Sequence, residues 1–163
     1  MRLFIAIRLT DEMKTAIAGT INELKKAGVR GRYVPPQNLH LTLAFIGEMD
    51  DPAPVEAALQ SVTVRPFRLS LSEMGSFGNL LWIGLKGSRE LYTATADVRT
   101  ALDEAGIPYD RKKFVPHITI LRKMTGTRDS VQAPKGEMTV RHISLMRSDV
   151  KDGKRIYTEV FSI

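Results

Sequence analysis

Residues 40–43, His-Leu-Thr-Leu, recur in conservative form as residues 117–120, His-Ile-Thr-Ile, so one short pattern occurs twice in a chain of 163 residues. Both segments alternate polar and apolar side chains, as a half-buried β-strand does. In such a strand the side chains at positions i and i+2 lie on the same face. We therefore expect each histidine to share a face with its threonine, while the aliphatic residues point into the core.

The sequence around these segments is repeated as well. The apolar run at residues 3–7 returns 78 positions later at residues 81–85. Each run is followed by a segment whose apolar residues have helical spacing, at 11–27 and 89–105. Two units with the same order of elements at a near-constant offset indicate an internal repeat.

Each helical segment runs into a glycine, Gly28 or Gly106, which can take the left-handed conformation common at helix ends. Each half then finishes with a further predicted strand, at 67–71 and at 141–145. A last strand is predicted near the C-terminus, at 157–163.

This pattern predicts an α+β fold with two pseudo-symmetric lobes, each an antiparallel sheet with flanking helices, and an active-site cleft between the lobes. We expect one bilobal domain over residues 1–163, because no linker or low-complexity tract divides the chain. The repeat covers roughly residues 1–73 and 79–150, and a C-terminal strand at 155–163 completes the fold.

Composition narrows the possible functions. With 43% hydrophobic and 26% charged residues, the chain resembles a soluble globular protein. The absence of cysteine excludes disulfides, thiolate zinc sites and cysteine nucleophiles. The N-terminal apolar run is interrupted by Arg8 and is too short for a signal peptide or a membrane span. We expect a cytoplasmic monomer with no membrane partner, and the net charge of +6 favours polyanionic ligands.

The paired segments carry acid/base chemistry suited to a phosphodiester. Imidazole titrates near neutrality, so one of His40 and His117 can act as a base while the other acts as an acid. The hydroxyls of Thr42 and Thr119 can hold phosphate oxygens. No third ligand is patterned for a metal, and we expect no cofactor. The third histidine, His142, imitates the pattern on another predicted strand, where we expect it to face outward without a catalytic role.

On these residues the chain resembles the two-histidine (2H) phosphoesterase superfamily, and closely its RNA 2′,3′-cyclic phosphodiesterases, also called LigT-like 2′-5′ RNA ligases. The resemblance extends over nearly the whole chain. It includes residues 1–6, 36–47, 66–67, 81–84 and 114–122, together with Ser148 and Tyr157. The chain departs from the family pattern at Tyr33, where tryptophan is common, and in the loop at residues 78–80.

The resemblance implies an enzyme that hydrolyses a terminal RNA 2′,3′-cyclic phosphate to a 2′-phosphomonoester, with reversible 2′-5′ ligation as a further activity. It implies that His40 is the proton donor and His117 the proton acceptor, a choice that the symmetry of the repeat leaves open. It also implies that Arg122 supplies a cation to the phosphate. Regular alternation places Arg122 on the other face of the strand from His117. Arg122 then reaches the phosphate only through its long side chain or a β-bulge.

Phe45 and Tyr33 are candidates for stacking on a base, although Phe45 has the strand parity of the core residues. Two alternatives remain open. One is another nucleotide cyclic phosphodiesterase of the same superfamily, and the other is a non-catalytic module that binds RNA ends. Carboxylate–histidine clusters at ligand spacing are absent, which argues against a metallohydrolase, and no phosphate-binding loop motif supports an ATP-dependent ligase.

Overall fold

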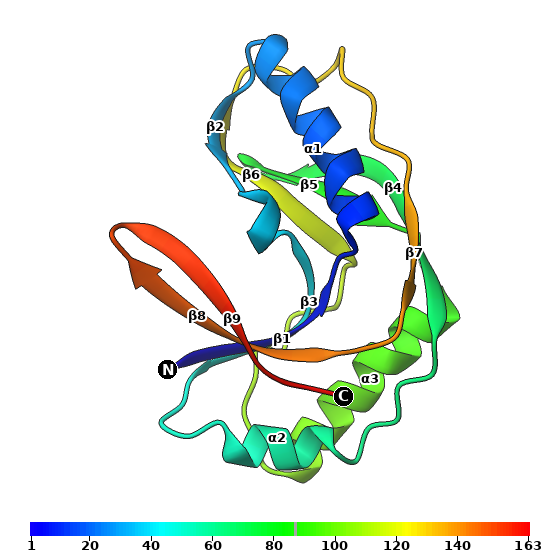
Figure 1. Cartoon of the computed structure of the whole chain (residues 1–163), viewed down its shortest axis with the longest axis vertical. Coiled ribbons are helices and arrows are strands. Elements are labelled where there is room, and N and C mark those ends of the chain that lie inside the picture. Colours follow the sequence, from blue (N-terminus) through cyan, green and yellow to red (C-terminus); the bar gives the residue numbers. More distant parts are fainter. Residues whose placement is uncertain (87) are drawn as a thin grey trace.

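The computed structural model describes residues 1–86 and 88–163 (Figure 1). These residues form two antiparallel sheets, with strand orders β3-β1-β8-β9 and β2-β6-β5-β4-β7, here called the first and the second sheet. In chain order the elements are β1 (Arg2–Arg8), α1 (Asp11–Lys26), β2 (Arg30–Tyr33), a 3-10 turn η1 (Pro36–Asn38), β3 (His40–Glu48), α2 (Ala53–Leu59), β4 (Phe67–Phe77), β5 (Leu80–Leu85), α3 (Arg89–Glu104), β6 (His117–Thr125), β7 (Glu137–Val140), β8 (Ser144–Lys151) and β9 (Lys154–Ser162). The predicted α+β class is confirmed.

The two long helices begin and end in the same way, as the repeat predicts. The side chain of Thr10 caps α1 and that of Ser88 caps α3, each by accepting a backbone N–H three residues further on, at 3.3 and 3.1 Å. Both helices are followed by a glycine in the left-handed region, Gly28 with φ +83° and Gly106 with φ +69°. Local sequence alone therefore sets both ends of these helices.

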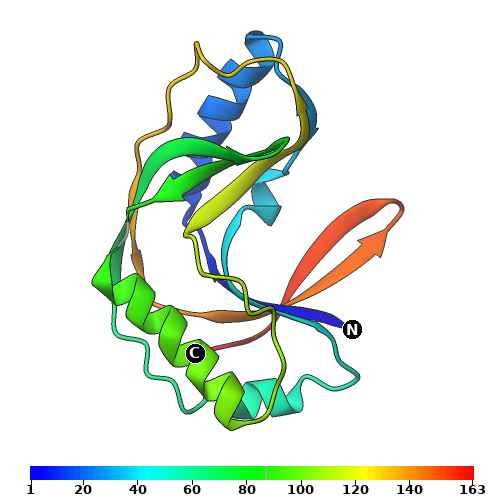
Figure 2. The same ribbon diagram turned by 180° about the vertical axis from the view of Figure 1, so that it is seen from behind.

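The two sheets do not coincide with the two sequence repeats. β8, from the second repeat, pairs with β1, and β4, from the first repeat, pairs with β5. The helices cross over as well: α1 contacts β2 of the second sheet, whereas α3 lies beside the first sheet, where it contacts β3, and also contacts β4 of the second sheet (Figures 1 and 2). A sequence period identifies equivalent elements but not the sheet that each one joins, because strand pairing is decided by long-range packing.

The core is continuous across both sheets. One cluster of buried side chains includes Ile5 of β1, Ile17 of α1, Ile83 of β5 and Val98 of α3. Within the described ranges, no helix has the length and apolar character needed to cross a bilayer. The β8–β9 hairpin projects from the body of the molecule (Figure 2), and it turns at Asp152-Gly153, where both residues have positive φ.

Some expectations about elements were wrong. The strand predicted at 141–145 begins only at Ser144, so His142 lies in the exposed segment before β8 rather than on a strand. Ile143 and Leu145 are nevertheless buried, as expected. The elements β2, α2 and β7 were not predicted, because each is short and carries little periodic signal.

Candidate active site

A β-bulge in β3 changes which residues share a face with the first histidine. Thr42 pairs with Ala6 and Ala44 pairs with Ile5, which leaves Leu43 without a partner on β1. One extra residue reverses the alternation of side chains beyond it. Phe45 therefore lies on the face of His40, with 49% of its surface exposed. Its expected core parity was wrong for this reason.

The same bulge occurs at the equivalent place in β6. Thr119 pairs with Trp82 and Leu121 pairs with Leu81, which leaves Ile120 without a partner on β5. Arg122 consequently moves to the face of His117 and is exposed. Because of the bulge, Arg122 lies on the same face as His117, which regular alternation does not allow. Arg122 is therefore the counterpart of Phe45 in the repeat.

Both histidine rings are held by the same backbone contact. His40 Nδ1 lies 2.7 Å from the carbonyl oxygen of Asn38, and His117 Nδ1 lies 2.6 Å from that of Val115. A carbonyl accepts but cannot donate, so each Nδ1 carries its hydrogen. In a neutral ring the remaining nitrogen, Nε2, is then the basic one, and each histidine offers Nε2 for proton transfer.

His40 and Thr42 form a hydrogen bond across their shared face. His40 Nε2 lies 2.9 Å from Thr42 Oγ1. Because Nδ1 of the neutral ring keeps the hydrogen, the threonine hydroxyl donates to Nε2. A substrate oxygen that approaches Nε2 must displace this hydroxyl.

The surroundings of His40 favour its neutral form. Burial lowers the pKa of His40 below its ordinary value of 6.5, and the hydrogen bond to Asn38 acts in the opposite direction. The positive charges of Arg122 and His117 lower this pKa further. Arg122 and His117 both lie on β6, which contacts β3, the strand of His40.

Each histidine is flanked by two aromatic rings. Phe4 lies 5.0 Å and Tyr157 5.2 Å from His40 between ring centroids. Phe77 lies 5.3 Å and Trp82 6.2 Å from His117. These four rings were not among the predicted site residues, although the equivalence of Phe4 and Trp82 in the repeat is a sequence signal for two of them.

Tyr33, a candidate for stacking on a base, lies on the face of β2 that packs against the core. It pairs with Leu121, whose side chain is buried, while its neighbour Arg32 pairs with the exposed Arg122. The Tyr33 hydroxyl donates to the carbonyl of Val29 at 2.6 Å, and the ring packs against the core. This placement gives no support to a contact between Tyr33 and a base.

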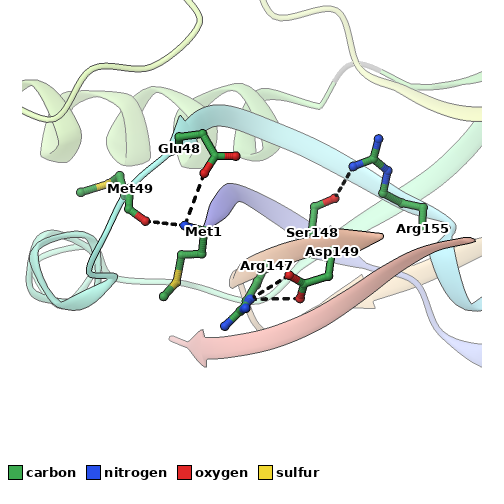
Figure 3. Close-up of polar contacts among 7 residues, drawn as sticks. All are labelled: Met1, Glu48, Met49, Arg147, Ser148, Asp149 and Arg155. Atoms are coloured by element: carbon green, nitrogen blue, oxygen red, sulfur yellow. Dashed lines mark hydrogen bonds and ion pairs between the residues drawn. The ribbon is translucent and has the colours of Figure 1, made fainter. Parts of the chain in front are cut away.

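The projecting hairpin is tied to the segment that precedes the first histidine. Asn38 Nδ2 donates to the carbonyl oxygen of Arg155 at 3.0 Å. Arg155 Nη1 in turn donates to Ser148 Oγ at 3.1 Å across the hairpin (Figure 3). The N-terminal ammonium of Met1 bonds to the carbonyl oxygen of Met49 beyond the other end of β3, at 2.7 Å (Figure 3). Strand β3 is therefore fixed on both sides of the site.

Candidate metal ligands do not gather here. In the part of the chain that the structure describes, no group of three or more histidine, aspartate and glutamate side chains could hold a metal ion. The site consists of imidazoles, hydroxyls, a guanidinium and aromatic rings.

Comparison with known proteins identifies the family. Residues 13–152 match the model of the 2′-5′ RNA ligase superfamily. The chain belongs to this superfamily, and the resemblance predicted from the paired His-x-Thr segments is confirmed. The RNA 2′,3′-cyclic phosphodiesterase of Archaeoglobus fulgidus is 34% identical over 175 residues, which cover 98% of each chain. The enzyme of the same name from Methanocaldococcus jannaschii is 29% identical, with 96% of each chain covered.

Solved structures show the same fold. E. coli LigT in its apo form superposes with a TM-score of 0.86 at 27% identity, covering 99% of this chain and 95% of LigT. E. coli LigT complexed with 3′-AMP gives a TM-score of 0.85 at 28% identity, covering 99% of this chain and 96% of LigT.

Proposed function

We propose that this chain is an RNA 2′,3′-cyclic phosphodiesterase that opens a terminal cyclic phosphate to a 2′-phosphomonoester by metal-independent general acid/base catalysis. Membership of the superfamily, together with relatives named RNA 2′,3′-cyclic phosphodiesterase, makes the chain a phosphoric diester hydrolase. The proposal adds the residues and their roles.

One observation carries the proposal. His40 and His117 occupy equivalent places in the repeat, and each has Nδ1 bonded to the carbonyl of the residue two positions earlier. Both rings therefore leave Nε2 for proton transfer, as an acid and a base require, and the contact between β3 and β6 supports a shared site. A module that only binds RNA ends would not require a pair of groups that can act as acid and base.

The proposed reaction moves one proton at each histidine. Neutral His117 takes a proton at Nε2 from the attacking water, and the new P–O bond forms as the bond from phosphorus to O3′ breaks. Protonated His40 gives its Nε2 proton to the departing O3′, which leaves the phosphate on O2′. Because burial and nearby cations favour neutral His40, the anionic phosphate of the bound substrate has to stabilise its protonated form.

The remaining groups act on the phosphate and on the base. The hydroxyls of Thr42 and Thr119 donate to non-bridging oxygens, and Arg122 balances the negative charge that develops there. Phe45, half exposed beside the ring of Phe4 at 6.3 Å, stacks on the base of the terminal nucleotide.

The test is product analysis on an oligonucleotide that ends in a 2′,3′-cyclic phosphate. The wild-type protein should yield the 2′-phosphate, and His40→Ala and His117→Ala should each lose at least about 100-fold in rate. His142→Ala is the matched control, since its histidine is exposed outside the site. A 3′-phosphate product would overturn the assigned leaving group, and binding without turnover would favour the RNA-end binding module.

Reversible 2′-5′ ligation is the second activity that this site could support, because a 5′-hydroxyl can take the place of water. The alternative of another nucleotide cyclic phosphodiesterase predicts that cyclic mononucleotides turn over at least as fast as RNA ends, which the assay measures when it is repeated on a cyclic mononucleotide. The monomeric state and the cytoplasmic location stay predictions.

A further inference from the structure

Two half-exposed phenyl rings lie one beside each histidine. Phe45 is 49% exposed and adjoins Phe4, which contacts His40. Phe77 is 48% exposed, and its ring stands edge-on to His117 at an interplanar angle of 83°. The proposed mechanism assigns Phe45 to the base of the terminal nucleotide, but it assigns no role to Phe77.

Phe77 is held firmly although it lies at a turn. It is the last residue of β4 and pairs with Leu80 across the two-residue turn to β5. Gly78 in this turn has φ +60°, and the carbonyl of Asn79 accepts the N–H of Met124 from β6 at 2.9 Å. Phe77 also packs on Trp82, with 5.3 Å between ring centroids. A large apolar ring fixed in this way, with half of its surface exposed, is ready to stack on a ligand.

The positions of the entering and leaving oxygens determine which ligand can contact Phe77. In an in-line displacement the entering and the leaving oxygen lie on opposite sides of phosphorus. His40 serves the leaving O3′, so the ribose that carries the cyclic phosphate lies on the side of His40 and Phe45. His117 serves the entering oxygen, so Phe77 lies on the side of the nucleophile. Water has no ring to stack, whereas a nucleoside that attacks through its 5′-hydroxyl has one.

We propose that Phe77 is the stacking platform for a second nucleoside, the one whose 5′ oxygen enters or leaves at phosphorus, and so selects for 2′-5′-linked substrates. This inference rests on the proposed function. In ligation, His117 takes the proton of the 5′-hydroxyl, the bond from O5′ to phosphorus forms, the bond to O3′ breaks, and His40 protonates O3′. Cleavage of a 2′-5′ linkage runs through the same steps in reverse, and neither direction needs a further reactant.

The test compares two substrates on the same protein: a 2′,3′-cyclic mononucleotide, which lacks the second nucleoside, and a 2′-5′-linked dinucleotide, which has it. Stacking on an aromatic ring typically changes affinity by about 5- to 150-fold per base. Phe77→Ala should therefore lower the ratio of kcat/KM for the dinucleotide to kcat/KM for the cyclic mononucleotide at least about fivefold. Phe45→Ala should weaken both reactions, because both substrates contain the nucleoside on its side.

Two further variants separate stacking from packing. Phe77→Tyr keeps the ring and should keep the ratio of the wild-type protein, whereas Phe77→Leu keeps apolar bulk and should lower it. The inference is overturned if Phe77→Leu restores the ratio, or if all three Phe77 variants lower both activities equally. It is also overturned if the wild-type protein hydrolyses the cyclic mononucleotide but never cleaves the dinucleotide. Failure to hydrolyse a cyclic phosphate at all would instead reject the proposed function.

Discussion

The guanidinium of Arg99 donates from Nε to the carbonyl oxygen of Leu43 at 3.1 Å. Leu43 is the bulge residue of β3, which is an edge strand of the first sheet, so a side chain of α3 can reach its carbonyl. Nη1 of the same guanidinium donates to the carbonyl of Lys112 at 2.9 Å, in the segment that leads into His117. Arg99 of α3 thus joins the strand of one histidine to the approach of the other.

Replacing Arg99 should therefore harm catalysis beyond its effect on stability. We expect Arg99→Met to lose about tenfold or more in kcat/KM, because small displacements of positioned groups cost large factors in rate. Arg99→Lys keeps the charge but not the planar fork, and should recover part of the loss. The measurement is activity at a temperature where thermal melting shows each variant folded. Full activity per folded molecule would leave Arg99 a purely structural role.

The titration of His40 should respond to Arg122. We expect NMR titration of the protein without ligand to give His40 a pKa below 6.5, as burial and the nearby positive charges require. Arg122→Met removes one of these charges, so the imidazolium is less disfavoured and the pKa of His40 should rise. Arg147→Met is the matched control, since Arg147 is exposed and pairs with Asp149 on β8. If the pKa of His40 is the same in Arg122→Met as in the wild type, the two groups do not interact electrostatically.

Chelation should leave the reaction intact. The proposed mechanism uses imidazoles, hydroxyls and a guanidinium, so hydrolysis of a cyclic phosphate should proceed at an unchanged rate after treatment with EDTA. Loss of turnover with chelator, restored by one divalent ion, would contradict the metal-independent mechanism.

His142 should be dispensable. It resembles His40 and His117, the proposed acid/base pair, in its sequence surroundings, but it lies exposed before β8. We expect His142→Ala to keep kcat within a few-fold of wild type, as is usual for surface substitutions outside a site. A loss of about 100-fold with the fold intact would assign His142 an acid/base role.

Those parts of the fold that depend on local chemistry could be predicted from the sequence. The glycines Gly28 and Gly106, which were predicted, act within one turn of a helix, so their signal is contained in a few neighbouring residues. The caps at Thr10 and Ser88, which were not predicted, are equally local. The exchange of β4 and β8 between the repeats could not be predicted, because it depends on which distant strand completes each sheet.

The site, like the fold, could be predicted only where the signal lies in neighbouring residues. The faces of His40 and Thr42 follow from alternation alone, whereas the place of Phe45 follows from a bulge whose carbonyl Arg99 satisfies from α3. The ring of Phe77 reaches His117 only because β4 pairs with β5 and β5 pairs with β6. The sequence pattern of one strand does not show which aromatic side chain of another strand packs against it.

The central claim is that His40 and His117 act as one acid/base unit, and a double-mutant cycle tests it most directly. The measurement is kcat/KM for hydrolysis of a 2′,3′-cyclic nucleotide by the wild type, His40→Ala, His117→Ala and the double variant. Each single variant should lose at least about 100-fold, and the double variant should lose little more than the worse single one, because groups that act as a unit are strongly non-additive. If the two losses multiply, or if either single variant keeps near-normal turnover, the two histidines do not form the proposed pair.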